Sequence, residues 1–223
     1  GTENVTVANL VLDGGLDDVL EDDSGAYLKN ADGKWRESDT SVLEALSDEE
    51  WDVITLQQAS HFSGMYDTYQ PYLDELVTFI RKHKPNAKIY WHKTWAYDKT
   101  STHGGFANYG GDQEKMANAI DDAAKKAAEF IGAETIPSGD VIRELRKLPE
   151  FDFPGEGQSL CRDGFHMHLV YGRYLLACVW FKTLLGRTPV GNNFMPDDVK
   201  EGEVVNTDLL VKLQKIGGAY YEA

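Results

Sequence analysis

Apolar residues along the chain follow two periods, one typical of strands and one typical of helices. Four short apolar runs predict strands: VTVANLVLD, WDVITLQQ, AKIYWHKTWAY and ETIPSG, at residues 5–13, 51–58, 87–97 and 134–139. Helical spacing predicts helices at residues 68–84, 112–132, 140–148 and 169–185, with Gly132 and Gly186 as C-caps. SDTSVLEALSDEE predicts a shorter helix with a Ser or Thr cap. Before it the chain is polar, and NADGKW predicts a turn.

Strand and helix alternate four times with short connections, and no internal repeat or linker interrupts them. This order predicts parallel strands joined by crossover helices in a three-layer α/β/α sandwich, one domain over residues 1–223. In such sheets, ligands bind at the carboxyl ends of the strands. The four predicted strand exits, DGG, LQQASH, HKTWAY and PSGD, are polar or rich in glycine. We therefore expect the functional site at this edge of the sheet.

Composition excludes some classes of function. The formal net charge of −15 argues against a nucleic-acid partner, because binding a phosphate backbone needs clustered Lys and Arg. No run of 18 apolar residues is present, so no membrane span is predicted. Two cysteines, Cys161 and Cys178, do not make a disulfide framework. The chain opens almost directly in a predicted strand, so its compartment cannot be read from this end.

The segment CRDGFHMH places Asp163 three residues before His166. A carboxylate beside an imidazole can fix its tautomer while the other ring nitrogen accepts a proton, which predicts an acid–base pair. The same spacing occurs by chance, so a surface or capping role is the alternative. His168 competes for the role of base, although it lies at the expected start of a helix, where it can cap or face solvent.

Two glutamines, Gln57 and Gln58, follow the second predicted strand and precede His61. Successive strand residues point to opposite faces, so one of the two amides should face the site and could donate a hydrogen bond to an oxyanion. The alternative is a structural amide that satisfies loop backbone groups. Ser60 and Ser63 lie nearby, but neither is in a Gly-x-Ser-x-Gly sequence.

Aromatic residues gather around His92 at the exit of the third predicted strand. They could form a wall on which a sugar stacks, or they could be core packing; they are Tyr90, Trp91, Trp95 and Tyr97. The histidines have no metal-binding spacing such as HExxH, so no metal is predicted. No glycine-rich phosphate loop is present, and no cofactor is expected.

Together, WDVITLQQASHFSG, YWHKTWAY, IPSGDVI and RDGFHMHLVYGRYLLACVWF resemble the sequence blocks of the DUF4886 group of SGNH (GDSL-like) hydrolases. This resemblance implies a flavodoxin-like sandwich and a Ser-His-Asp esterase acting on a small-molecule ester or an acylated carbohydrate. Asp163 and His166 match the Asp-x-x-His block of the superfamily. The oxyanion hole corresponds to Gly14 or Gly15 and to Gln57 or Gln58. His61 and Trp95 are expected near the substrate.

One block of the superfamily is missing. The serine belongs to a Gly-Asp-Ser or Gly-Asn-Ser block after a strand that precedes VTVANLVLDGG, and neither triplet occurs in this chain. We therefore expect the scaffold of an esterase without its nucleophilic serine and without its first strand. One alternative is a non-catalytic relative that binds a glycan or an ester in the same cleft. Another is that Ser60 or a different hydroxyl has become the nucleophile.

Overall fold

The structure is a computed structural model that describes residues 5–12, 25–31, 34–196, 199 and 204–219, and only the backbone of the strands within 25–39. Its main sheet has four parallel strands in the order β1-β4-β5-β6. They are β1 (Val7–Leu12), β4 (Val53–Gln58), β5 (Lys88–His92) and β6 (Glu134–Ile136). The predicted parallel sheet is confirmed.

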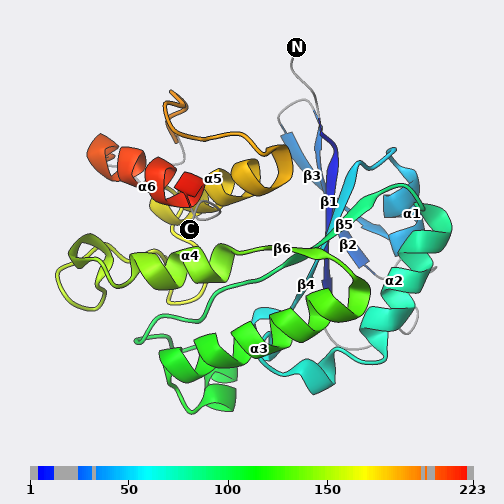
Figure 1. Cartoon of the computed structure of the whole chain (residues 1–223), viewed down its shortest axis with the longest axis horizontal. Coiled ribbons are helices and arrows are strands. Elements are labelled where there is room, and N and C mark those ends of the chain that lie inside the picture. The colour runs from blue at the N-terminus through cyan, green and yellow to red at the C-terminus, as the bar shows by residue number, and fades with distance from the viewer. Residues whose placement is uncertain (1–4, 13–24, 32–33, 197–198, 200–203, 220–223) are drawn as a thin grey trace.

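Helices cover both faces of this sheet (Figure 1). One face carries α1 (Val42–Ser47), α2 (Tyr72–His83) and α3 (Gln113–Ile131). The other carries α4 (Ser138–Leu145), α5 (Tyr171–Leu185) and α6 (Thr207–Ala219). Short 3₁₀ helices lie at Ser60–Phe62, Tyr66–Thr68, Gly104–Tyr109 and Pro149–Phe151. The molecule is thus a three-layer α/β/α sandwich, as predicted. No helix among the residues described here combines the length and apolar character needed to cross a bilayer.

Strand β4 shows how the pleat divides the core into two layers. Ile54 and Leu56 point to the face covered by α2 and α3, whereas Val53 packs with residues of α4, α5 and α6. Successive side chains of a strand alternate between the faces. The alternation continues to the end of the strand, so Gln57 lies on the α5 face and Gln58 on the α2 face.

Three features differ from the sequence-based expectation. Residues 25–40, expected only to contain a turn, form an antiparallel hairpin of β2 (Gly25–Ala31) and β3 (Lys34–Thr40). Helix α6 was not predicted. The strand expected at 87–97 ends at His92, whose partner Ile136 is the last residue of β6.

The ends of the helices follow the predicted capping signals. The Ser41 hydroxyl accepts a hydrogen bond from the Glu44 backbone N–H at 3.2 Å, and the Glu44 carboxylate accepts one from the Ser41 backbone N–H at 3.4 Å. This reciprocal pair is a capping box for α1. Gly132 and Gly186 end α3 and α5 with φ of 64° and 63°, a left-handed conformation that favours glycine.

Replacing the capping serine should destabilise the protein. Ser41→Ala removes the acceptor for the first turn of α1, and we expect it to lower the free energy of unfolding by about 1 kcal/mol. Ser47→Ala serves as the control, since the Ser47 hydroxyl bonds only to the Leu43 carbonyl on an exposed surface. Urea denaturation measures both. Equal stability of the Ser41→Ala variant and the wild type would contradict this role of the cap.

Candidate active site

Asp163 and His166 form a hydrogen-bonded pair on a surface loop. The His166 Nδ1–H donates to Asp163 Oδ2 at 2.7 Å, and the backbone N–H groups of His166 and Phe165 donate to Asp163 Oδ1 at 2.8 and 3.2 Å. Burial raises the pKa of the Asp163 carboxyl, but these hydrogen bonds outweigh it and hold the pKa below its ordinary value. Because an ionised carboxylate only accepts hydrogen bonds, the proton of neutral His166 lies on Nδ1 and the lone pair on Nε2.

The second ring nitrogen of His166, Nε2, is on an exposed side chain. The imidazole side chain is 56% exposed, against 39% for the Asp163 carboxylate. No hydrogen bond to Nε2 is present within the described part of the chain. The pair therefore has the geometry of a base whose accepting nitrogen faces outward.

Hydrogen bonds from the segment after β5 hold this loop. The Asp98 backbone N–H donates to the Gly164 carbonyl at 2.7 Å, and the Trp95 indole N–H donates to the Phe165 carbonyl at 2.8 Å. Gly164 has φ of 90°, and a Cβ there would lie 2.9 Å from Ser101 Cα. Only glycine fits this close approach. The loop is thus fixed to the carboxyl edge of the sheet, although it is about 70 residues away in sequence from Trp95.

A buried ion pair anchors the same segment. Asp98 is 3% exposed and pairs with Arg146, the residue that follows α4, whose guanidinium also donates to the Ala96 carbonyl at 2.8 Å. The Ser159 hydroxyl donates to the second carboxylate oxygen of Asp98 at 2.7 Å. The Cys161 backbone N–H donates to the same Ser159 oxygen at 2.9 Å. This cluster connects the exit of β5, helix α4 and the start of the Asp163–His166 loop.

His168 has a different role. Its Nδ1 accepts hydrogen bonds from the backbone N–H groups of Val170 and Tyr171 at 3.2 and 3.4 Å. Its ring stacks on that of Tyr171 with centroids 5.4 Å apart. His168 therefore caps the beginning of α5, one of the two roles expected for it.

Rings form a continuous row beside His166. The Phe165 ring lies 4.2 Å from the His166 ring and 4.7 Å from the His103 ring, between centroids. The His61 ring follows at 6.1 Å from His103. Sequence reasoning placed His61 near the substrate and did not select Phe165. The sequence could have indicated Phe165, because this residue lies inside the Asp-x-x-His block.

The predicted aromatic wall is largely core. Tyr90 and Trp91 are 3% and 1% exposed, which favours the packing alternative for these two residues. Trp95 is partly buried against the α5-side core, with its ring centroid 6.3 Å from that of His92. Because its indole N–H donates to the Phe165 carbonyl, Trp95 supports the loop that carries His166.

The two glutamines have different surroundings. The Gln58 amide is buried, accepts from the Ala59 backbone N–H at 2.8 Å and donates to the Thr68 hydroxyl at 3.2 Å. Gln58 is therefore the structural amide. Gln57 is partly buried on the other face, where its Oε1 lies 2.8 Å from His92 Nδ1. The other nitrogen of His92 lies 2.9 Å from the hydroxyl of Ser138, a residue that sequence reasoning missed.

The described residues supply His166 with no nucleophile. The Ser60 hydroxyl bonds to the Tyr97 hydroxyl at 2.8 Å, and the Ser63 hydroxyl donates to the Ser60 carbonyl at 2.8 Å. Throughout the described ranges, no serine or threonine hydroxyl is hydrogen-bonded to His166. Gly14 and Gly15, the predicted oxyanion glycines, lie outside the described residues.

The cysteines are not nucleophiles in this state. Both thiols are free and buried. Burial raises the pKa of Cys161 to about 12 and that of Cys178 to about 11, so both remain protonated near neutral pH. Among the residues described, no group of three or more His, Cys, Asp or Glu side chains is arranged to hold a metal ion.

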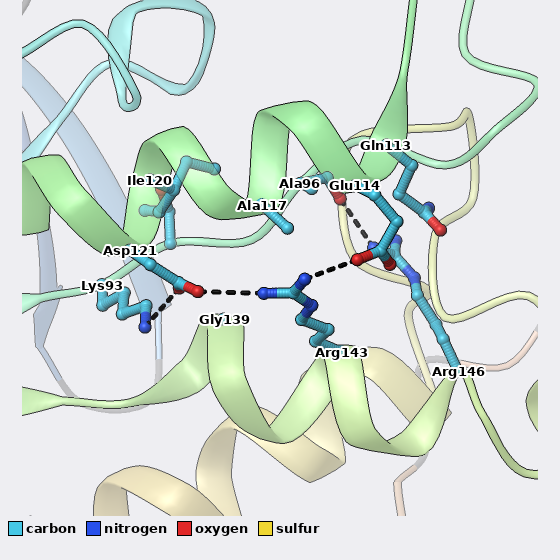
Figure 2. Close-up of a pocket in the computed structure, with 11 residues that line it drawn as sticks. Lys93, Ala96, Gln113, Glu114, Ala117, Ile120, Asp121, Gly139, Arg143 and Arg146 are labelled. Atoms are coloured by element: carbon cyan, nitrogen blue, oxygen red, sulfur yellow. Dashed lines mark hydrogen bonds and ion pairs between the residues drawn. The ribbon is translucent and has the colours of Figure 1, made fainter.

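Two hollows lie away from His166. The one between α3 and α4 has a volume of about 20 Å³, room for about one water molecule. Figure 2 shows a row of ion pairs along it: Asp121 pairs with both Lys93 and Arg143, and Arg143 also pairs with Glu114. The other, about 530 Å³, is an open groove beside α3 and the end of β6. Neither is lined by Asp163, His166 or Gln57.

The family of the chain follows from its sequence match. The model of a family described as a domain of unknown function, DUF4886, matches residues 18–208. The chain belongs to the DUF4886 family. The membership predicted from the sequence blocks is therefore confirmed. No curated protein matches the chain.

The solved structures that match this chain include one of the same family. That of a DUF4886 family protein from Bacteroides uniformis has 36% identity and a TM-score of 0.77, over 89% of this chain and 74% of its own. A predicted SGNH hydrolase from Slackia heliotrinireducens has 22% identity and a TM-score of 0.47, over 63% and 69%. An acetylxylan esterase from Geobacillus stearothermophilus (a catalytic mutant) has 14% identity and 0.39, over 63% and 65%. At these values the last two likenesses transfer no activity to the DUF4886 chain.

His92 should make the stability of this DUF4886 protein depend on pH. Burial lowers its pKa to about 3, from 6.5, so below pH 6.5 the unfolded chain binds a proton that the folded protein does not. We expect the free energy of unfolding to fall by about 2 kcal/mol more between pH 7 and pH 5 in the wild type than in His92→Gln. Urea denaturation at the two pH values measures the difference. An equal fall in both proteins would show that folded His92 titrates normally.

Proposed function

We propose that this DUF4886 protein is an SGNH-type hydrolase of carboxylic esters of small alcohols or carbohydrates, with His166 as general base. The observation that carries the proposal is the Asp163–His166 pair, in which the carboxylate holds Nδ1 at 2.7 Å and Nε2 is open to solvent. In the buried His92, by contrast, both ring nitrogens are hydrogen-bonded to protein groups. Here one nitrogen is fixed and the other is left for a reacting group.

Proton transfer at His166 follows from this geometry. A serine hydroxyl placed at Nε2 gives its proton to that nitrogen as its oxygen attacks the ester carbonyl carbon. The imidazolium that results is stabilised by Asp163 Oδ2, which does not itself take the proton. His166 then protonates the alcohol as the carbonyl–oxygen bond breaks. Water repeats the sequence on the acyl-enzyme and releases the acid.

The oxyanion needs donors at the same edge of the sheet. Gln57 is the glutamine available for this, since the Gln58 amide is already bonded to Ala59 and Thr68. A side-chain amide is a typical donor to a tetrahedral intermediate. Backbone N–H groups at Gly14 or Gly15 remain part of the proposal.

The nucleophile in this proposal is the serine of a Gly-Asp-Ser or Gly-Asn-Ser block, a triplet that residues 1–223 do not contain. Ser60 is a poor candidate, because its hydroxyl is bonded to Tyr97 and not to His166. If no such serine exists, the same edge is a binding site for an ester or a glycan, and the histidine has nothing to deprotonate. The two cases differ in chemistry, not in the site residues.

The substrate class rests on the row of rings beside His166. Phe165, His103 and His61 form a partly exposed surface of aromatic and imidazole faces. Flat rings accept the apolar face of a sugar or a short acyl chain, and the ring N–H groups can donate to hydroxyls. Trp95 contributes by supporting this surface, through the Phe165 carbonyl.

Ester hydrolysis tests the proposal directly. We expect the protein expressed from the full coding sequence to hydrolyse p-nitrophenyl acetate, and His166→Ala to lower kcat by about 10²- to 10⁴-fold, the contribution of a general base. The chain of residues 1–223 should show little or no turnover. His168→Asn is the matched control, because it keeps a capping acceptor at α5 and should keep kcat.

Two results would sink the proposal. One is full activity in the His166→Ala variant. The other is absence of hydrolysis by the full-length protein together with tryptophan-fluorescence binding of acetylated xylo-oligosaccharides by the chain of residues 1–223. That second pattern identifies the site as a binding site.

A further inference from the structure

Three side chains at the exits of three neighbouring strands form a chain of hydrogen bonds. Gln57 is the second-last residue of β4, His92 ends β5 and Ser138 follows β6 at the start of α4. Gln57 Oε1 and His92 Nδ1 are 2.8 Å apart, and His92 Nε2 and Ser138 Oγ are 2.9 Å apart. We propose that the buried Ser138–His92 pair sets the direction of the Gln57 amide, so that its NH₂ group faces the open carboxyl edge of the sheet as an oxyanion donor.

The position of each proton follows from counting partners, starting at Ser138. Its side chain is completely buried, and His92 Nε2 is its only hydrogen-bond partner in the described part of the structure. A buried hydroxyl proton without an acceptor would lose its hydration and gain nothing. The Ser138 O–H therefore donates to His92 Nε2.

The rest of the chain follows from that first step. Since His92 Nε2 accepts, the proton of the neutral ring lies on Nδ1 and donates to Gln57 Oε1. The Gln57 amide is then oriented with its oxygen inward and its NH₂ group outward. In the opposite arrangement, with the Gln57 nitrogen toward His92, the ring proton would lie on Nε2 and the buried Ser138 proton would have no acceptor.

The Gln57 nitrogen is free to meet a ligand. Within the described residues, Gln57 Nε2 has no hydrogen-bond partner. Two side-chain atoms of the described residues are buried without a hydrogen-bond partner, Gln70 Nε2 and His83 Nε2. Gln57 Nε2 is not among them, so it is not a buried atom that lacks a partner. Gln57 is only partly buried, so its NH₂ group reaches solvent.

Aromatic rings keep the pair in one state. The Trp180 ring of α5 meets the His92 ring edge-on at 4.9 Å between centroids, and Trp95 lies at 6.3 Å. These rings help to exclude water, and burial lowers the pKa of His92 to about 3, so the ring stays neutral at ordinary pH. The direction of the Gln57 amide is therefore independent of pH in the range where an esterase would work. Ser138 and His92 are positioning residues, because neither reaches the substrate.

The position of the ring proton can be measured without any activity. Two-bond ¹H–¹⁵N correlation spectra of the ¹⁵N-labelled chain, assigned with His92→Gln, report which nitrogen of His92 is protonated. We expect a neutral ring protonated on Nδ1 in the wild type, and a shift toward Nε2–H in Ser138→Ala. Ser63→Ala is the matched control, a buried serine that does not contact His92. Protonation on Nε2 in the wild type would overturn the inference.

The use of Gln57 as an oxyanion donor rests on the proposed ester hydrolysis, and kinetics test it separately. In the protein from the full coding sequence, Ser138→Ala should lower kcat roughly tenfold and leave KM little changed. This loss is smaller than the fall in kcat of about 10²- to 10³-fold that is typical when an oxyanion donor is removed entirely, because Gln57 is still present. Ser138→Thr, which keeps a hydroxyl, should recover most of the rate. Unchanged kcat in Ser138→Ala would contradict the positioning role. A ring protonated on Nδ1 in a protein without esterase activity would support the amide direction and reject the proposed function.

Discussion

The site depends on the buried ion pair between Asp98 and Arg146. Asp98 comes six residues after β5 ends, and Arg146 follows α4. Their contact fixes the irregular segment that follows β5 at the point where the Asp98 backbone N–H also bonds to the Gly164 carbonyl. A buried pair that loses one partner leaves an uncompensated charge and typically costs about 3–5 kcal/mol. The position of His166 is therefore fixed by an interaction that its own loop does not contain.

The pleat of the parallel sheet determines which side chains reach this edge together. Gln57 and His92 both point to the α5 face, because each lies an even number of residues from a side chain of that core: Val53 for Gln57 and Tyr90 for His92. Helix α4 begins directly after β6 and brings Ser138 to the same level. The parallel order of the strands therefore assembles a hydrogen-bonded row from residues far apart in sequence.

Sequence patterns predicted those features that depend on neighbouring residues. The four strands of the main sheet, five of the helices, the Ser41 cap and the C-cap glycines follow from local periodicity and composition, and Asp163 and His166 are only three residues apart. Features that depend on distant contacts were missed. The Gln57–His92 and His92–Ser138 bonds join residues separated by 35 and 46 positions. To choose between Gln57 and Gln58, one must know which helical layer covers each face of the sheet. To predict helix α6, one must know that it packs against α5.

Covalent labelling tests the central claim, that His166 is the base for a serine, most directly. The protein expressed from the full coding sequence would be treated with a fluorophosphonate and the labelled residue mapped by peptide mass spectrometry. The account predicts one labelled serine outside residues 1–223, with the labelling rate at least about 10²-fold lower in His166→Ala. Labelling of Ser60, or an equal rate in the His166→Ala variant, would contradict it.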